Sequence, residues 1–302
     1  MWSLALELQL AVHSTEVRVK LAPMVMLITG CRSGIGLAIA LAAARSGYVV
    51  YAGLRDLATK DNLISQSEGL EIVPLQLDVT KEEDRTTAIE QIQREQGRLD
   101  VLVNNAGIGL GGFLEEITEE ELRASFEVNI FGVWSLSKEA IPLLRVSKGT
   151  LIMISSLSGT MALPGLGAYC ASKFALEGLT ETWRHELKPF GINVISIQPG
   201  AYKTDISGPN RRMSVNQGTA HPLYTIMACN MEAWYDQNAV AKAYPPSHLA
   251  ENLMKVLNKR HPKLRYAIGP STGLRRFLLT IFPFKFLETY FHRVLTASKG
   301  DQ

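Results

Sequence analysis

The sequence is poor in cysteine, and its basic and acidic residues nearly balance. Three cysteines, Cys31, Cys170 and Cys229, stand far apart among 302 residues. This is neither a disulfide framework nor the spacing of a metal site, so we expect no metal and a reducing, cytoplasmic setting. The 31 basic and 29 acidic residues leave a net charge of +2, and 46% of the residues are hydrophobic. These values are typical of a globular protein with an ample core.

The first 23 residues lie outside the pattern of the rest. The stretch from Leu4 to Val12 is partly apolar, but Glu7 and Gln9 interrupt it and no basic stretch precedes it. It therefore has the features of neither a signal peptide nor a membrane span. We expect residues 1–23 to be an extension, either flexible or docked as a short helix, and residues 24–302 to form the domain. Translation of the extension from an upstream codon is an open alternative.

Tyr169 and Lys173 place a phenol and an ammonium four positions apart, on one face of a predicted helix. A phenol titrates near ~10 in water, so it exchanges protons poorly at neutral pH unless a nearby cation stabilises its anion. Ser156 lies thirteen residues before Tyr169, at the end of a predicted strand, and could hold a substrate oxygen against the phenol. A Tyr/Lys pair at this spacing is common by chance on helices, so it becomes informative only beside a cofactor site.

A glycine turn near the start offers such a site. The apolar run from Val25 to Ile28 leads into a Thr-Gly-x-x-x-Gly-x-Gly turn, and a helical stretch from Leu37 to Arg45 follows. In this order, backbone N–H groups at the helix N-terminus face a pyrophosphate, and glycines allow its close approach. The alternative is a turn that only reverses the chain. The expected cofactor contacts in the turn are Gly30, Arg32, Ser33, Gly34, Ile35 and Gly36.

Apolar strand patterns alternate with helical ones from Met24 to Gly200, without repeats or low-complexity segments. This alternation predicts an α/β fold: a single-domain, Rossmann-type, doubly wound parallel sheet with helices on both faces. Two pairs have the spacing of capping boxes that open helices, Thr118 with Glu121 and Thr80 with Glu83. The helix after Thr80 is expected to close at Gly97.

Together, these features resemble the short-chain dehydrogenase/reductase family, over about residues 24–269. Within the family, the run from Tyr169 to Leu179 and the stretch from Lys263 to Tyr266 resemble the 17-beta-hydroxysteroid and retinol dehydrogenases. The resemblance implies a homodimer or homotetramer. Further matches lie in the expected order: Leu77-Asp78-Val79, Asn104-Asn105-Ala106-Gly107, Asn129, Pro199-Gly200 and Thr204.

The resemblance also implies a role for each matched residue. Tyr169 would be the general acid in reduction and the base in oxidation, and Lys173 would lower its pKa and bind the nicotinamide ribose. Ser156 would hold the substrate carbonyl, and Asn129 would hold a water that supplies protons. Neither Ser155 nor Ser158 has the thirteen-residue spacing. The other implied cofactor contacts, whose ordinary alternatives are turns and caps, are Asp78, Val79, Asn104, Asn105, Ala106, Gly107, Pro199, Gly200 and Thr204.

Charges beside the second predicted strand, residues 48–54, favour NADP(H) over NAD(H). An acidic residue at the strand tip would bind a ribose 2′-hydroxyl and repel a 2′-phosphate, but a strand that ends at Leu54 has no acid there. Arg55 can make a bidentate contact with a phosphate, and Arg32 lies on the same side of the expected site. If the strand ends later, Asp56 would instead take the acidic role.

Residues 206–245 lose the alternation and gain prolines, methionines and aromatic residues. The family has its variable substrate loop and lid here, and such residues suit a lipophilic substrate. The alternative is that they only cover the core.

The end of the chain is basic and aromatic. Residues 255–302 carry ten Lys or Arg and two acids, a net charge of +8, against −6 for the remainder, and aromatic residues are interleaved with cations in residues 270–302. Such a segment can lie on an anionic membrane surface, although its longest apolar run, from Phe277 to Phe284, is too short to span a bilayer. The competing interpretation is a helix that packs beside the substrate cleft with a solvated basic face. No nucleic-acid motif accompanies the charge, so no nucleic acid is expected.

We therefore predict an NADP(H)-dependent oxidoreductase that interconverts a carbonyl and an alcohol on a steroid-like or retinoid-like molecule. A reductase of long-chain acyl or sphingoid ketones would need the same catalytic residues. A nucleotide-sensing scaffold without turnover is the alternative of another class, and the intact Ser156, Tyr169 and Lys173 argue against it.

Overall fold

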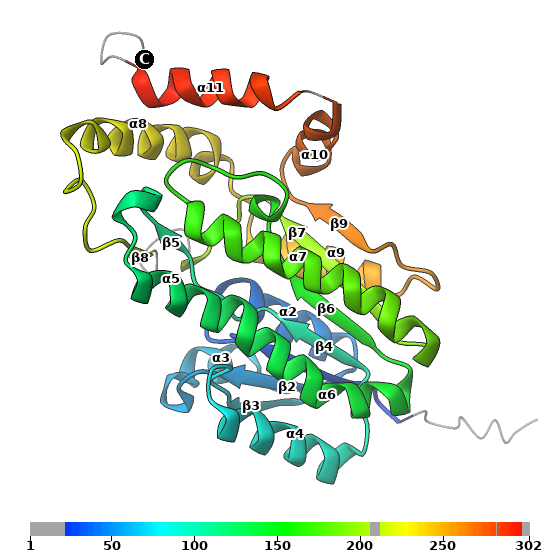
Figure 1. Ribbon diagram of the computed structural model, residues 1–302. Coiled ribbons are helices and arrows are strands. Elements are labelled where there is room, and N and C mark those ends of the chain that lie inside the picture. Colours follow the sequence, from blue (N-terminus) through cyan, green and yellow to red (C-terminus); the bar gives the residue numbers. More distant parts are fainter. Residues whose placement is uncertain (1–21, 206–211, 282, 298–302) are drawn as a thin grey trace, which may run out of the picture.

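In the computed structural model, which describes residues 22–205, 212–281 and 283–297, seven parallel strands form one sheet (Figure 1). Their order is β3-β2-β1-β4-β6-β7-β9. The strands are β1 (Val25–Thr29), β2 (Val49–Leu54), β3 (Ile72–Gln76), β4 (Val101–Asn104), β6 (Thr150–Ile154), β7 (Asn193–Pro199) and β9 (Arg265–Ile268). The helices are α2 (Gly34–Arg45), α3 (Asp61–Gln66), α4 (Glu82–Gln96), α5 (Glu119–Phe126), α6 (Val133–Ser147), α7 (Gly167–Leu187), α8 (Pro222–Asn238), α9 (Pro246–Leu257), α10 (Thr272–Ile281) and α11 (Phe284–Thr296). A separate parallel pair joins β5 (Leu110–Gly111) to β8 (Arg212–Met213).

Helices cover both faces of the sheet, as predicted. Alternate residues of a strand point to opposite faces, so Met26 and Ile28 join the core under α2 and α9, whereas Leu27 joins the core under α4, α6 and α7. All five residues of β1 are buried. A central parallel strand covered on both sides has no polar face, which explains the continuous apolar runs in the sequence.

The carboxyl ends of the strands share one edge of the sheet. The chain leaves β1 for α2 on one face and passes from β4, the neighbour of β1, toward helices of the other face. Such a divergence opens a crevice between the two strand ends, the usual ligand site of this architecture. The glycine turn after β1 therefore lies where a nucleotide would bind.

One predicted capping box is confirmed and the other is wrong. The Thr118 hydroxyl accepts from the N–H of Glu121, whose carboxylate accepts from the N–H of Thr118, so α5 begins as expected. Thr80, in contrast, donates its N–H and hydroxyl to Asp78 Oδ1, at 3.0 and 2.8 Å. This turn delays the helix, so α4 begins at Glu82; it ends as predicted before Gly97, whose φ is +66°.

The substrate segment is more regular than the sequence suggested. Residues 206–211 lie outside the described residues, as does most of the predicted extension, but α8 occupies seventeen residues of the segment. In Figure 1, α11 lies alongside α8 at one end of the molecule. Trp234 of α8 donates from Nε1 to the Tyr290 hydroxyl at 2.6 Å and packs edge-on against Phe291. Within the described chain, every helix is too short or too polar to pass through a bilayer.

Candidate active site

The glycine turn has the geometry that a pyrophosphate requires. Gly30 and Gly34 have φ values of +73° and +61°, which glycine adopts without strain. A Cβ on Gly36 would overlap the carbonyl oxygen of Gly30 and the amide of Asn105. The turn is therefore as close to its neighbours as glycine permits, and the first N–H groups of α2 remain available to an anion. These residues fit a dinucleotide cofactor.

Asn105 fixes this turn to the end of β4. Its amide donates to the carbonyl oxygens of Thr29 and Gly30, at 2.8 and 3.2 Å. The backbone N–H groups of Asn105 and Ala106 both donate to the Thr29 hydroxyl, at 2.9 and 2.8 Å. The walls of the crevice thus have a fixed separation before any ligand arrives. On the far side, Thr204 packs against Gly34.

Ser156, Tyr169 and Lys173 come together beside this crevice. Tyr169 and Lys173 lie on α7, and Lys173 Nζ is 5.7 Å from the centroid of the Tyr169 ring. Lys173 is buried and donates from Nζ to the carbonyl oxygen of Ile154 at 2.9 Å. Ser156 lies two residues after the end of β6 and caps a short helical turn, where its Oγ accepts from the N–H of Ser158.

Burial dominates the acidity of both catalytic candidates. It raises the pKa of Tyr169 to about 12, and interaction with the Ser156 hydroxyl lowers that pKa in part. Burial also lowers the pKa of Lys173 to about 8. A phenol with this pKa holds its proton at neutral pH, so it is a donor unless a cation comes to its aid.

Asn129 lies at a widened turn between α5 and α6, where residues Glu127–Gly132 form a π-helix. Such turns are frequent at functional sites. Its Oδ1 accepts from the N–H of Ile108 at 2.9 Å, and its Nδ2 donates to the Ile108 carbonyl and to Ser172 Oγ, both at 3.0 Å. Gly107, beside Asn129 and Lys173, has no side chain to separate them.

The structure turns Asn104 and Ser155 away from the positions of their sequence neighbours Asn105 and Ser156. Asn104, expected at the cofactor, points its amide into the core, where Nδ2 donates to Ser137 Oγ at 2.8 Å, so that expectation is wrong for its side chain. The reason is alternation along β4, which turns Asn105 to the turn and Asn104 to the helices. Ser155 is buried, and its hydroxyl faces the carboxylate of Glu177 on α7.

At the tip of β2, where the adenosine is expected, there is a cation and no acid. β2 ends at Leu54, as expected. Asp56 accepts from the N–H of Ala58 at 2.9 Å and so caps the following turn, and Arg55 is exposed. Arg32 Nη2 lies 3.7 Å from Asp205 Oδ2, and the same oxygen accepts a hydrogen bond from the Ser33 hydroxyl.

Asp78 and Val79 follow β3 at the same edge of the sheet. The N–H of Asp78 donates to Asp84 Oδ2 at 2.8 Å, and Val79 is buried against Gly132. Both residues therefore have structural partners of their own, and their expected contact with adenine remains a prediction.

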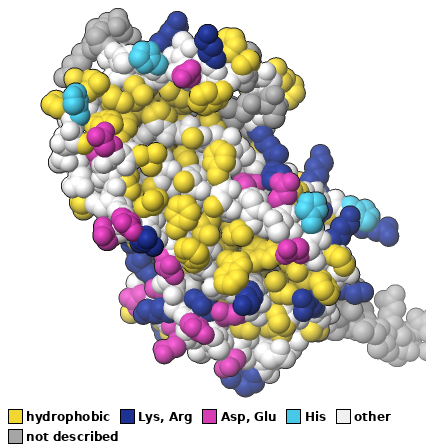
Figure 2. Space-filling model, in the orientation of Figure 1, with side chains coloured by type: hydrophobic (Ala, Val, Ile, Leu, Met, Phe, Trp, Pro, Cys, Tyr) yellow, Lys and Arg dark blue, Asp and Glu magenta, His cyan; other side chains and the backbone are white. Residues whose placement is uncertain are grey.

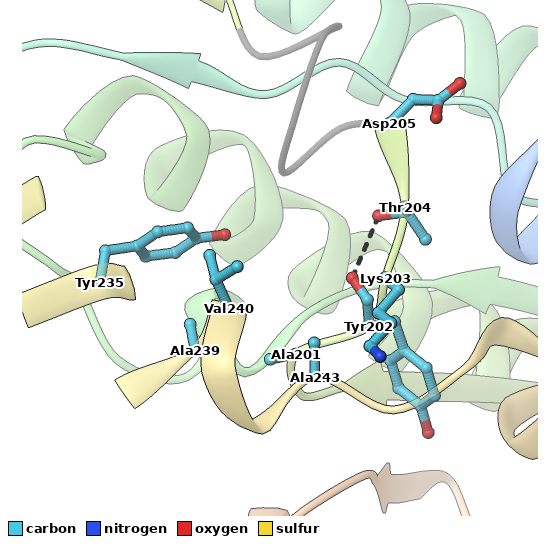
Figure 3. A pocket seen from close by; sticks show the side chains of 9 residues that line it. All are labelled: Ala201, Tyr202, Lys203, Thr204, Asp205, Tyr235, Ala239, Val240 and Ala243. Atoms are coloured by element: carbon cyan, nitrogen blue, oxygen red, sulfur yellow. Dashed lines mark hydrogen bonds between the residues drawn. The ribbon is translucent and has the colours of Figure 1, made fainter. Parts of the chain in front are cut away.

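A cavity of about 380 Å³ opens beside Thr204 and Asp205 (Figure 3). Figure 3 shows Tyr235, Ala239 and Val240 on one side and Thr204 and Asp205 on the other. A smaller, mostly apolar pocket shares Tyr235 and is lined further by Phe113, Leu166, Met213, Met231 and Trp234. Tyr235 thus lines both pockets.

Sequence reasoning missed two features of this site. Helix α8 supplies Tyr235, and its start could have been found from His221 followed by Pro222, because proline favours the first helical position. The buried carboxylate of Glu177, one turn beyond Lys173, also went unnoticed, because a glutamate four residues after a lysine looks like a surface ion pair. Among the described residues, no three metal-binding side chains converge.

Comparison with known proteins agrees with this geometry. The family model described as short chain dehydrogenase matches residues 24–214. The chain is 35% identical to a 3-ketodihydrosphingosine reductase of Bacteroides thetaiotaomicron, over 82% of this chain and 88% of that protein. It is also 35% identical to 17-beta-hydroxysteroid dehydrogenase type 1 of Homo sapiens, over 82% of this chain and 77% of that protein.

Solved structures show the same likeness. A short-chain dehydrogenase from Streptomyces avermitilis superposes with a TM-score of 0.76 at 31% identity, covering 90% of this chain and 97% of that one. An alcohol dehydrogenase from Thermococcus sibiricus, solved with 5-hydroxy-NADP, has a TM-score of 0.67 at 26% identity, covering 82% of this chain and 96% of that one.

Proposed function

Because the chain belongs to the short-chain dehydrogenase family, whose members act on alcohol and carbonyl groups, we propose that it interconverts a ketone or aldehyde and an alcohol on a lipophilic molecule, with Tyr169 as general acid and base. The observation that carries this proposal is the meeting of Ser156, Tyr169 and Lys173 beside the glycine turn.

Each residue has a definite task in this proposal. The nicotinamide, when bound, supplies or accepts the hydride. In reduction, Tyr169 gives its proton to the carbonyl oxygen, which Ser156 holds and polarises. In oxidation, Tyr169 must act as a phenolate, and because burial opposes that form, the Lys173 cation has to stabilise it. Asn129 lies next to Lys173 and is expected to hold the water that returns the proton.

The pocket walls support the proposed substrate class. Apolar and aromatic side chains of α8 and of residues 163–166 line the smaller pocket, which shares Tyr235 with the larger cavity, and the two together suit a hydrophobic molecule with one reacting oxygen. A steroid-like or retinoid-like substrate is the first candidate, since the human relative is named for a hydroxysteroid. A sphingoid or long-chain acyl ketone is the second, since the bacterial relative is named for 3-ketodihydrosphingosine.

A single assay separates these candidates. The purified protein is mixed with NADPH and, in turn, ketosteroids, retinal and long-chain ketones, and the absorbance of the reduced cofactor is followed. We expect turnover with at least one lipophilic carbonyl, and its loss in Tyr169→Phe, which removes the proton donor but should leave NADPH binding nearly intact. Nucleotide binding without turnover on any of these compounds would instead favour the nucleotide-sensing scaffold. Wild-type turnover in folded Tyr169→Phe would overturn the mechanism.

NADP(H) is the cofactor that we propose. The absence of an acid at the tip of β2 supports it, as does the exposed cation of Arg55 directly after that tip. Asp56, the possible acidic ligand of NAD(H), is occupied with the turn that it caps. Arg32 lies close enough to contribute if it exchanges Asp205 for a phosphate.

Two surfaces support proposals about partners. Exposed apolar side chains gather on the face formed by α5, α6 and α7, visible in Figure 2, and we propose that this face joins two copies of the chain in a homodimer or a tetramer built from it. At the C-terminal end, Leu274, Phe277, Leu278 and Ile281 form an exposed stripe along α10, and we propose that it contacts an anionic membrane.

A further inference from the structure

The carboxylate of Glu177 lies one turn beyond Lys173 on α7, and the mechanism above gives it no task. Residues four apart share a face of a helix, so both side chains point from α7 toward the sheet. Only 7% of Glu177 is exposed. A buried carboxylate costs free energy unless its charge has partners, so the surrounding groups must offset that cost.

Ser196 of β7 and Arg265 of β9 hold the two carboxylate oxygens. Ser196 Oγ donates to Oε1 at 2.5 Å, and Arg265 Nε donates to Oε2 at 2.8 Å. Arg265 also pairs with Glu181, a half-exposed residue one turn further along α7. Burial opposes the ionisation of Glu177, but these hydrogen bonds outweigh it and lower the pKa of Glu177 below its usual value. Glu177 is therefore an anion at neutral pH.

Two further polar side chains face the same carboxylate. The amide of Gln198 and the hydroxyl of Ser155 also lower the pKa of Glu177, although neither makes a hydrogen bond of regular geometry. Gln198 Oε1 in turn accepts from Arg276 Nη1 of α10 at 2.8 Å. The charged groups around Glu177 are thus Lys173 and Glu181 on its own helix, Arg265 on β9 and, through Gln198, Arg276.

Lys173 and Glu177 are both buried and lie one helical turn apart on the same face of α7, close enough for the charge of Glu177 to act on Lys173. Lys173 is buried, and its burial lowers its pKa to about 8, while the negative charge of Glu177 counteracts part of that effect. Because this pKa is close to neutral pH, the loss of one nearby anion changes the fraction of Lys173 that is charged. The proposed mechanism needs Lys173 charged, because the phenolate of Tyr169 depends on it.

We propose that Glu177 is a positioning residue whose fixed negative charge keeps Lys173 cationic and thereby keeps the phenolate of Tyr169 accessible. The inference rests on the proposed role of Lys173. Glu177 acts through Lys173, without contact with the substrate, and Ser196 and Arg265 keep its own charge in place.

The experiment is a titration of Lys173 by nuclear magnetic resonance in the full chain. Lysine side chains are isotope-labelled, and the signal of Lys173 is assigned from its absence in Lys173→Met. In Glu177→Gln, which keeps the size and loses the charge, we expect Lys173 to lose its proton at a pH about one unit lower. In Glu177→Asp, which keeps the charge, the titration should stay close to that of the wild type. An unchanged titration in folded Glu177→Gln would overturn the inference.

Alcohol oxidation gives a second readout. At pH 8 we expect Glu177→Gln to turn over about fivefold more slowly, since fewer molecules hold the phenolate and the ammonium together, and Glu177→Asp to lose much less. A merely structural role would impair both variants alike and leave the titration of Lys173 in place. The titration needs no substrate, so a wild type that oxidises no alcohol would refute the proposed function without affecting this test.

In Glu177→Gln, Arg265 keeps only the carboxylate of Glu181, so a second variant guards against a failure of Glu177→Gln to fold. In that case, Lys173 is titrated in the double variant Glu177→Gln with Arg265→Gln. The same downward direction is expected, because Glu177 is the charge that most affects Lys173. A titration at or above the wild-type pH in the double variant would contradict the inference.

Discussion

At the residue scale, two arginines compete for the role of phosphate ligand. Arg32 is 3.7 Å from Asp205, whereas Arg55 is exposed directly after the tip of β2. We expect Arg55→Ala to weaken NADPH much more than NADH, because only NADPH carries the 2′-phosphate. Loss of a charge-assisted contact costs about 1.5 to 3 kcal/mol, or roughly ten- to hundredfold in Kd.

Fluorescence titration with both cofactors measures this difference. Arg94→Ala is the matched control. Arg94 is an exposed arginine in the last turn of α4, and its replacement should leave both affinities unchanged. Equal losses for NADPH and NADH in Arg55→Ala would show that Arg55 does not discriminate. A wild-type preference for NADH would assign the role to Asp56.

Single residues show how far the sequence could lead. The spacing from Ser156 to Lys173 was sufficient to predict that a hydroxyl, a phenol and an ammonium meet, because only a short helical turn and a loop separate β6 from α7. The choice between Asn104 and Asn105 was not predictable, since it depends on which face of β4 each one takes. The partners of Glu177 come from β7 and β9, and Arg265 is 88 positions away, a contact that no local pattern contains.

At the element scale, helices α10 and α11 are the part of the protein that we expect to contact a membrane. On α10, Leu274, Phe277, Leu278 and Ile281 repeat at the spacing of one helical face, and all are exposed. Of the cations in this segment, Arg276 donates from Nη1 to Gln198 Oε1 in the body of the protein, so it does not face lipid headgroups. Lys285 and Arg293 are exposed on α11, where they are accessible to lipid headgroups.

We expect the wild type to bind anionic vesicles at low salt, and less as salt rises, because exposed charges are screened over roughly 8 Å at physiological ionic strength. Leu274→Glu with Ile281→Glu should weaken this binding at least about tenfold, since burying one such side chain is worth about 1.5 to 3 kcal/mol. Vesicle sedimentation measures it, with Val146→Glu, an exposed site on α6, as control. If the helices only border the cleft, the wild type will not sediment with vesicles at all.

At the scale of the whole molecule, the layered fold was predictable because strands covered on both sides must be apolar throughout. The layer of α8, α10 and α11 was not, because its residues follow no regular alternation, and α11 is positioned by contacts such as those of Trp234 with Tyr290 and Phe291. Oligomer formation also concerns the whole molecule. The core is already buried within one chain, so an interface between chains has to be sought on the surface.

The face formed by α5, α6 and α7 is the surface that we expect to join two chains. It carries exposed apolar side chains on each of these helices and on the π-helix between α5 and α6: Leu122, Phe131, Trp134 and Phe174. Lys138 lies over the Trp134 ring, 5.1 Å from its centroid, so a cation borders the apolar surface. A patch of this kind that pairs with itself about a two-fold axis closes into a dimer without leaving a free copy of the same surface.

The last prediction is that Trp134→Glu, with a charge at the centre of this face, converts the wild-type oligomer into a smaller species. Two carboxylates brought together across a two-fold interface repel each other and lose their hydration. Light scattering coupled to gel filtration measures the mass. Val146→Glu is the control, since Val146 is exposed on the same helix about 120° around its axis from Trp134. Trp134 is half exposed, so its replacement should leave the fold intact, which circular dichroism verifies. A wild type that is monomeric, or a Trp134→Glu protein of unchanged mass, would refute this face as the interface.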